Sequence, residues 1–432
     1  MATPVWRPIL SGEALASARE ALTDITASLA AGASPRARED WSPELVRARA
    51  ATLSDGFAGQ ALYCGYLHQA GGGRQAADLG LALLNRAIET AGAERMPPGL
   101  YGGFSGIAWV ANHLAGRLYE PDEDDPYEET DGVLHDYARH ARWPFQYELL
   151  NGLVGIGVYA LERLPRASGR QCLETIVDRL AEVAQRGRDG ITWLTPSAFV
   201  GEHRLEQAPQ GGYYLGMAHG VPGVVSLLAA LWAADVARDR VGPLLEGAVS
   251  WLLAQSLPAG SLSRFPLWWS AETKPTPSRL AWCYGDPGVA ASLLWAAAAL
   301  ERDDWRREGL ATALAAARRP LATSGVRDAG LCHGSAGVAH IFNRLYQATG
   351  EEELGRAALF WYEQLLAART PGEGHGGYMF ERIGADGAFR VSDPGFLNGT
   401  VGVGLVLLAA TTAVEPAWDR ALLTSVPPRA CG

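Results

Sequence analysis

The chain has little lysine, methionine and cysteine, no excess of positive charge and no long apolar run. Lys274 is its single lysine, and the formal net charge of the 432 residues is −10. We expect no nucleic-acid partner, because binding to phosphates needs a basic surface that this sequence lacks. The apolar segments reach about a dozen residues, which is too short to span a bilayer. Met1 to Leu10 also lacks the basic and apolar regions of a signal peptide, so we expect a cytoplasmic protein. The use of arginine in place of lysine indicates a high-GC coding bias, and we therefore expect a bacterial source.

The five cysteines of the chain fall into different sequence settings. An odd number of cysteines in a large, reduced protein argues against a disulfide framework. Cys64 and Cys172 stand in apolar helical sequence and are predicted to be core residues. Cys283 and Cys332 stand in polar, glycine-rich sequence, which favours a role in metal binding or catalysis.

A Gly-x-x-Gly sequence followed by a helix-length apolar segment recurs seven times. We expect the first glycine to let the chain turn sharply into a helix and the second to let neighbouring backbone approach the first turn closely. A segment that is apolar on most sides, such as Val289 to Leu300, predicts a buried helix. The first glycines of the seven copies are Gly56, Gly103, Gly152, Gly220, Gly285, Gly334 and Gly399.

Amphipathic segments between these buried helices predict outer helices with one solvated face. Examples are residues 74–90, 170–186, 242–255, 305–318 and 352–368. Alternating inner and outer helices predict stacked hairpins, which either stay open as a solenoid or close into a ring. We favour closure, because the inner helices are too apolar to line an open groove. The predicted fold is an all-α α/α toroid of seven inner and seven outer helices, in which residues 1–432 form one domain with a core of about 53–410.

Three of the repeats carry insertions that are rich in aromatic residues, glycine and proline. These insertions either cover a cleft at the glycine end of the helices or pack over their rim. They fall at residues 188–218, 258–282 and 370–398 and contain Trp193, Tyr213, Tyr214, Trp268, Trp269, Tyr378 and Phe380.

The residue before each first glycine is expected at the same end of the fold in every repeat. His219, Tyr284 and His333 hold this position in the fourth to sixth repeats, and Cys283 and Cys332 stand one residue earlier in the fifth and sixth. Two thiolates and an imidazole suit zinc, and three protein ligands leave a fourth position open, as in catalytic sites. We therefore predict one Zn²⁺ per chain on Cys283, Cys332 and His333. The alternative is that the cysteines are small core residues and the histidines only form hydrogen bonds.

Two further residues in this pattern have more than one interpretation. His219 is either a fourth ligand that closes the site or a general acid/base beside the metal. Arg279, four residues before Cys283, either stabilises developing negative charge or forms a salt bridge at the rim. An open zinc site can activate water, polarise a carbonyl or deprotonate a bound thiol. Thiolate ligands reduce the Lewis acidity of zinc, which favours thiol alkylation over hydrolysis.

The repeats, with Trp-Cys-Tyr-Gly at 282–285, Cys-His-Gly at 332–334 and Ala-His-Gly-Val-Pro-Gly at 218–223, resemble the lanthionine synthetase C-like family from about Leu53 to Ala410. The resemblance implies the toroid and a zinc ion on Cys283, Cys332 and His333. It also implies a lanthipeptide cyclase of lantibiotic biosynthesis. Such an enzyme adds a peptide cysteine thiol to dehydroalanine or dehydrobutyrine, which gives a lanthionine or methyllanthionine thioether.

The same resemblance assigns roles to residues around the metal. His219 becomes the acid/base, and Arg279 and Tyr284 match positions that line the site. The family usually has aspartate four residues before the first glycine of the third repeat, where this chain has Glu148. Glutamate keeps the charge and adds one methylene, so we expect Glu148 to orient His219 or to assist proton transfer.

The resemblance also implies partners and leaves other functions open. The chain is about one toroid long, so a separate dehydratase is expected to act first on a leader-bearing precursor peptide, in a complex with an export transporter at the membrane. Addition of glutathione or another free thiol to dehydroamino acids is one alternative, and a non-catalytic, zinc-containing peptide-binding toroid is another. A third alternative is an α/α-barrel glycoside hydrolase, which needs two facing carboxylates in its cleft. At the glycine turns only Glu148, Asp286 and Asp55 offer them.

Overall fold

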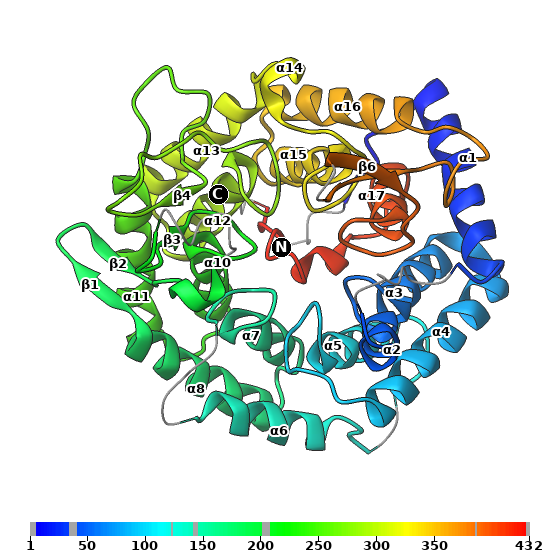
Figure 1. The fold of residues 1–432 in the computed structure, drawn as a ribbon, viewed down its shortest axis with the longest axis horizontal. Coiled ribbons are helices and arrows are strands. Elements are labelled where there is room, and N and C mark those ends of the chain that lie inside the picture. Colours follow the sequence, from blue (N-terminus) through cyan, green and yellow to red (C-terminus); the bar gives the residue numbers. More distant parts are fainter. Residues whose placement is uncertain are drawn as a thin grey trace. The chain divides into compact units, whose positions relative to one another are not determined.

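The computed structural model describes residues 6–33, 41–121, 124–140, 146–200, 208–384 and 387–428. Within these ranges helices dominate, and the strands form two-stranded antiparallel pairs (Figure 1). The described residues contain no helix that is both long and apolar enough to cross a membrane. The chain divides into two compact units: the first is Met1–Tyr127, Val326–Asn343 and Gly355–Trp418, and the second is Glu128–Gly325, Arg344–Leu354 and Asp419–Gly432.

Each of the seven apolar segments forms an inner helix that begins one residue after the first glycine of its repeat. In α10, α12 and α17 almost every side chain is buried, as expected for helices that are apolar on all sides. The inner helices are α3 (Phe57–Leu67), α5 (Phe104–Leu114), α7 (Leu153–Glu162), α10 (Val221–Ala233), α12 (Asp286–Ala299), α15 (Ser335–Thr349) and α17 (Thr400–Thr411).

Both glycines of the repeat are required by a backbone carbonyl that packs against them. A Cβ on Gly220 would lie 2.0 Å from the carbonyl oxygen of Tyr214, and one on Gly223 would lie 2.5 Å from that of Met217. The other first glycines face the carbonyl six residues earlier at under 3.0 Å in the same way. The φ angle of Gly220 is −133°, which is extended backbone open to any residue. The first glycine is therefore needed for close approach, as the second is, and not for the sharp turn that the sequence suggested.

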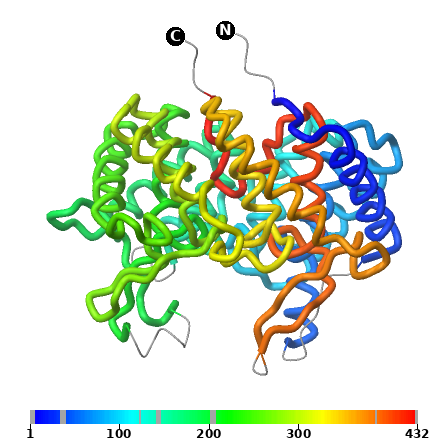
Figure 2. The backbone as a smooth tube through the Cα atoms, turned by 90° about the horizontal axis from the view of Figure 1, so that it is seen from above, coloured from blue at the N-terminus to red at the C-terminus, as the bar shows by residue number. Residues whose placement is uncertain are grey.

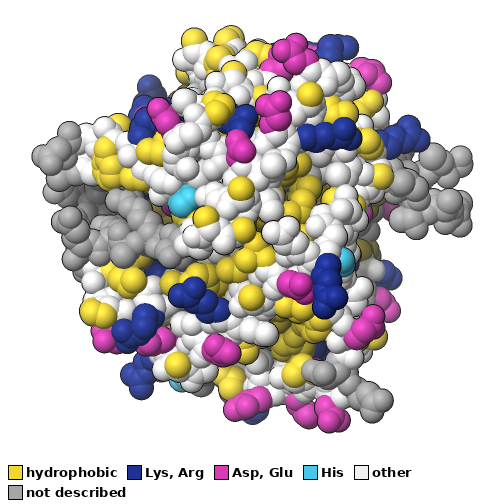
Figure 3. All heavy atoms as spheres, turned by 90° about the vertical axis from the view of Figure 1, so that its right-hand side faces the viewer, with side chains coloured by type: hydrophobic (Ala, Val, Ile, Leu, Met, Phe, Trp, Pro, Cys, Tyr) yellow, Lys and Arg dark blue, Asp and Glu magenta, His cyan; other side chains and the backbone are white. Residues whose placement is uncertain are grey.

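The predicted outer helices are present as amphipathic helices that pack on the inner ones. α3 packs on α4, α7 on α8, α10 on α11, and α12 on α13. On the face shown in Figure 3, where α1 and α4 lie, described acidic and basic side chains are interspersed, as expected for solvated outer faces. The outer helices that follow an inner helix are α4 (Gly73–Ala93), α6 (Glu128–Ala138), α8 (Ala167–Val183), α11 (Arg238–Ala254), α13 (Asp303–Ala317) and α16 (Glu352–Ala367).

The last inner helix, α17, takes its outer partner from the start of the chain. Helix α1 (Gly12–Ala30) packs on α17 through a buried face that includes Leu22 and Ile25 (Figure 2). The indole Nε1 of Trp6 donates to the carbonyl oxygen of Ala409 at 2.7 Å, and the N–H groups just before α1 donate to that of Ala410. Within the first unit, the two ends of the repeat series are thus joined by packing and by hydrogen bonds.

The insertions bury several of their aromatic residues. Strand β3 pairs with β4, which ties residues 188–218 to residues 258–282 in the second unit. Trp193 and Trp268 are buried, and so is Tyr378 in the third insertion. The smaller elements are α2 (Pro43–Ala51), η1 (His68–Gly72), β1 (Gln185–Gly187), β2 (Gly190–Thr192), η2 (Ser197–Phe199), β3 (Tyr213–Tyr214), β4 (Trp268–Trp269), α14 (Leu321–Ser324), β5 (Phe380–Gly384), β6 (Gly387–Val391) and η3 (Ala417–Arg420).

Candidate active site

Every residue predicted for the site lies at a glycine turn that precedes an inner helix. The turns of one unit are linked to each other by backbone hydrogen bonds. In the second unit Leu149 donates its N–H to Ala218 at 3.2 Å, and Ala218 donates to Cys283 at 3.3 Å. In the first unit Cys332 donates to Leu397 at 2.8 Å. The second unit holds Glu148, His219, Arg279, Cys283 and Tyr284, and the first unit holds Cys332 and His333.

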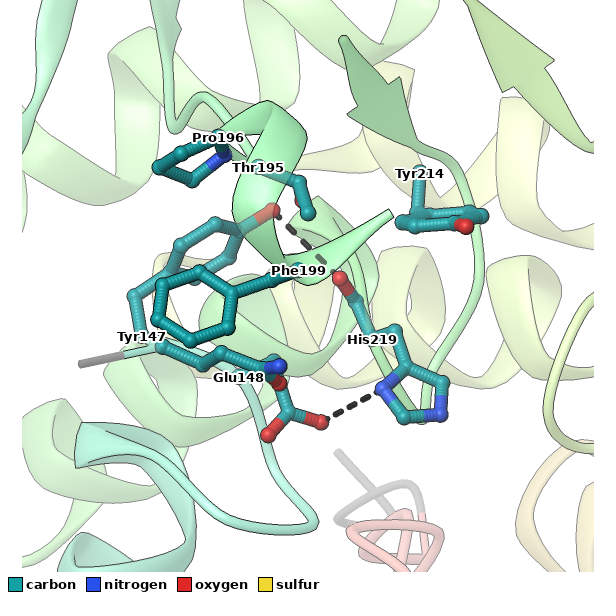
Figure 4. Close-up of a pocket in the computed structure, with 8 residues that line it drawn as sticks. Tyr147, Glu148, Thr195, Pro196, Phe199, Tyr214 and His219 are labelled. Carbon is teal, nitrogen blue, oxygen red and sulfur yellow. Dashed lines mark hydrogen bonds and ion pairs between the residues drawn. The ribbon is translucent and has the colours of Figure 1, made fainter. Parts of the chain in front are cut away.

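Glu148 and His219 are in direct contact. Oε2 of Glu148 lies 2.7 Å from Nδ1 of His219, and the Glu148 side chain is 3% exposed (Figure 4). The carboxylate also accepts the backbone N–H groups of Leu150 at 3.0 Å and Asn151 at 2.7 Å. The longer side chain of glutamate thus folds over its own turn and still reaches the imidazole. This contact directs Nδ1 towards the carboxylate and leaves Nε2 facing away from it.

The surroundings of His219 shift its pKa upward. Burial alone lowers the pKa of the imidazole, but the charge and the hydrogen bond of Glu148, together with the charge of Cys283, outweigh it. The side chain remains 30% exposed. His219 is therefore a group that can hold a proton near neutral pH and still exchange it with a ligand.

Two tyrosines fix the plane of the His219 ring. The ring of Tyr284 stacks on His219 with a centroid separation of 5.7 Å and an interplanar angle of 20°. The ring of Tyr214 lies 5.3 Å from that of Tyr284 and 6.2 Å from that of His219. Tyr284 was expected at the site, whereas the sequence placed Tyr214 only among the insertion aromatics. Its position six residues before Gly220, where the chain packs against the turn, is the signal that could have found it.

Arg279 contacts the sulfur of Cys283. Its Nη2 donates to Sγ at 3.9 Å, and the Cys283 side chain is buried. Gly325, with a φ of 74°, leaves room for Arg279, since a Cβ there would lie 2.7 Å from the arginine Cβ. Within the described part of the chain the guanidinium faces this sulfur, and not a carboxylate at the rim. A positive charge beside a thiol favours the thiolate, which is the form that binds a metal.

His333 has the surroundings expected of a metal ligand. Its Nδ1 is buried and has no hydrogen-bond partner among the described residues. A buried polar atom without a partner costs about 1–3 kcal/mol, and a metal ion would remove that cost. The turn that carries His333 is held by Asp328, whose carboxylate accepts the N–H of Gly330 at 2.9 Å. Two thiols with an imidazole suit zinc, so Cys283 of the second unit and Cys332 and His333 of the first remain the predicted ligands.

Cys64, Cys172 and Asp286 have structural surroundings. Cys64 and Cys172 are buried, and burial raises the pKa of each thiol to about 12, so their assignment to the core is confirmed. The carboxylate of Asp286 accepts the N–H groups of Arg264 at 2.7 Å and Phe265 at 3.1 Å. Asp286 thus has structural partners in this loop, whereas glycoside hydrolysis needs a carboxylate that faces the substrate.

Comparison with known proteins identifies the family and the fold of this chain. The family model described as "Lanthionine synthetase C-like protein" matches residues 48–423. A Danio rerio protein named "Glutathione S-transferase LANCL1" is 27% identical over 317 residues, which are 71% of this chain and 72% of that protein. The solved structure of nisin cyclase matches with a TM-score of 0.71 at 19% identity and covers 87% of this chain and 92% of that one. The likeness confirms the predicted all-α α/α-toroid fold class. The chain belongs to the lanthionine synthetase C-like protein family.

Proposed function

We propose that this protein is a zinc-dependent lanthipeptide cyclase. It would join cysteine thiols of a leader-bearing precursor peptide to dehydroalanine or dehydrobutyrine residues that a separate dehydratase has made. The observation that carries the proposal is the contact of 2.7 Å between Glu148 and His219. This pair lies at a turn that is hydrogen-bonded to Cys283. It supplies a proton-exchanging group next to a thiol-rich donor set in a chain of this family.

The zinc ion is held by Cys283, Cys332 and His333 in this proposal. The soft donor set supports the assignment, and so does the buried, unpartnered Nδ1 of His333. When bound, zinc lowers the pKa of a substrate thiol and leaves its sulfur nucleophilic. Arg279 holds the Cys283 sulfur in place and adds positive charge beside it.

His219 handles the proton of the reaction. A C–S bond forms at the β-carbon of the dehydro residue, the thiol loses its proton, and the α-carbon gains one, so the peptide mass does not change. Glu148 holds Nδ1 and raises the pKa of His219, which leaves Nε2 to donate to the α-carbon. Tyr284 keeps the imidazole plane fixed while this happens.

A second candidate function is addition of a free thiol, such as glutathione, to a dehydroamino acid. The relative named as a glutathione S-transferase favours it, because its match extends over 71% of this chain. The bond formed is the same, and the two functions differ only in whether the thiol belongs to the peptide.

Mass spectrometry separates the two functions. The zinc-loaded protein is incubated with a dehydrated, cysteine-bearing peptide, with and without glutathione, and remaining thiols are alkylated. A cyclase removes the thiol with no change in mass, whereas the second function adds the mass of glutathione. His219→Asn serves as the inactive control. A peptide that keeps both its thiol and its mass with the wild-type protein would contradict both functions.

A further inference from the structure

Two of the insertions build a small apolar cluster directly behind the rings that contact His219. We call it the Trp268 cluster, after its largest side chain. Its buried members are Val200, Ala208, Tyr214 and Trp268. The ring of Tyr284 packs against this cluster from the turn of the fifth repeat. Small satellite clusters of this kind are common under long loops, but this one includes a ring that also lies beside the acid/base group.

The ring contacts run in series from Trp268 to His219. The indole meets the ring of Tyr214 edge to face, with a centroid separation of 4.6 Å and an interplanar angle of 65°. Tyr214 in turn lies 6.2 Å from the imidazole, beside which Figure 4 shows it. Tyr214 also lies 5.3 Å from Tyr284, which stacks on the imidazole at 5.7 Å. All of these separations are in the range in which aromatic rings attract each other.

The backbone gives the indole of Trp268 a defined place. Strands β3 and β4 pair with Tyr214 opposite Trp268, which puts the two side chains on the same face. The N–H of Leu215 donates to the carbonyl oxygen of Leu267 at 3.2 Å, next to this pair. Gly212 lies against the indole, because a Cβ there would be 2.2 Å from Cζ2 of Trp268. With its side chain 4% exposed, Trp268 is held on every side.

The imidazole of His219 needs support at its face as well as at its edge. Glu148 holds the ring at Nδ1 alone, and the side chain is 30% exposed, so the ring could still turn about that contact. An acid/base group works best when packing locks its rotamer within about 10–20° of the productive orientation. Tyr284 provides the face contact, and the Trp268 cluster holds Tyr284 from the side away from its own turn.

We propose that Trp268 is a positioning residue, which acts through the two tyrosines and keeps the imidazole of His219 in the plane that proton transfer needs. This inference rests on the proposed cyclase function. A displacement of about 1 Å at a reacting group can cost about 10²-fold in rate. Loss of the indole should therefore lower kcat, whereas KM, which reports the binding of the peptide, should change little.

Two substitutions of Trp268 separate positioning from mere filling of the core. Trp268→Phe keeps an aromatic edge for Tyr214, whereas Trp268→Leu fills part of the space without a ring. With the zinc-loaded protein and a dehydrated, cysteine-bearing peptide, Trp268→Leu should lower kcat about 10²-fold and keep KM and zinc content. Trp268→Phe should retain most of kcat. Trp305→Leu removes an equally buried tryptophan, 4% exposed, from the outer helix α13 and should leave kcat unchanged.

The NMR shift of the His219 ring protons reports the stacking without any need for activity. In protein with isotope-labelled histidine, the His219 signal is the one that is missing from His219→Asn. The ring current of Tyr284 displaces this signal while the two rings are stacked. The signal should move towards the unstacked value in Trp268→Leu and stay in place in Trp268→Phe and Trp305→Leu.

Other outcomes separate this inference from the proposed function. If the wild type cyclises the peptide and Trp268→Leu keeps both kcat and the His219 shift, the inference is wrong and the cyclase function stands. A change in only one of the two measurements also overturns it. If the wild type cyclises nothing, the proposed function fails, and the shift alone decides: a moved signal in Trp268→Leu supports the inference and an unmoved one overturns it. Should Trp268→Leu fail to fold, Gly212→Ala, whose methyl group would displace the indole, should show the same losses.

Discussion

Glu148 makes its hydrogen bond to His219 while the same carboxylate holds its own turn. Oε2 lies 2.7 Å from Nδ1 of the imidazole, and both carboxylate oxygens accept backbone N–H groups two and three residues along the chain. The extra methylene relative to aspartate is accommodated by this fold-back. The His219 imidazole is thus held at Nδ1 by Glu148 and stacked against the ring of Tyr284.

Replacing Glu148 with glutamine should slow cyclisation about 10²–10³-fold, as expected for a disturbed general acid/base. The pKa of His219 is raised by Glu148, so removal of that charge lowers it. The protonated form is then lost at lower pH, and the alkaline limb of the pH–rate profile should move downward. Zinc content should stay unchanged. An unshifted alkaline limb would show that Glu148 does not set the protonation of His219.

The sequence was sufficient to predict the position in the fold of the candidate site residues that follow the repeat. His219, Tyr284 and His333 stand one residue before a first glycine and Cys283 stands two residues before one, so the repeat places all four at turns before inner helices. The repeat gave these positions although the reason predicted for the first glycine was wrong, because both glycines are needed for close contact with a backbone carbonyl.

The parts without a repeat could not be predicted. Phe199 lies in an insertion, where no offset relates it to the turn, and its place beside His219 depends on tertiary packing. Tyr214 lies in the same insertion, and only its position six residues before Gly220 relates it to the turn. The sequence also could not predict which outer helix packs on α17. The periodicity of α1 shows that one face is buried, but not which helix covers it.

Metal content should depend on the three predicted ligands and on no other cysteine in the core. Cys283→Ala and His333→Ala should each reduce zinc from about one per chain to a small fraction, since a tetrahedral site with three protein ligands tolerates few losses. Cys172→Ala, at a buried thiol with a pKa of about 12, should keep its zinc. Inductively coupled plasma mass spectrometry gives the ratio. His219→Asn should also keep zinc, and its loss there would make His219 a ligand.

Gly220→Ala should destabilise the protein by about 3 kcal/mol or more, because the added methyl group would clash with backbone atoms that cannot move aside as a flexible side chain can. The added Cβ would lie 2.0 Å from the carbonyl oxygen of Tyr214. Gly92→Ala is the matched control, since nothing lies within 4 Å of a Cβ at that position of α4. The control should gain about 0.5–1 kcal/mol from helix propensity. Urea unfolding measures both, and equal stability of the two variants would refute the close-approach explanation of the repeat.

Asp286 should make stability fall as the pH rises from about 4 to about 6. Burial raises the pKa of its carboxyl from 3.8 to about 6, although hydrogen bonds from Arg264 and Phe265 oppose the shift. Between these two pH values the folded protein binds more protons than the unfolded chain, so the free energy of unfolding decreases with increasing pH. Above about pH 6 this contribution no longer changes with pH. A shift of about two units corresponds to about 3 kcal/mol at most. The measurement is the difference in unfolding free energy between the wild type and Asp286→Asn across this range. Because the variant lacks the titrating group, the difference should decline towards pH 6, and a difference that rises or stays constant would show that the carboxylate is charged throughout.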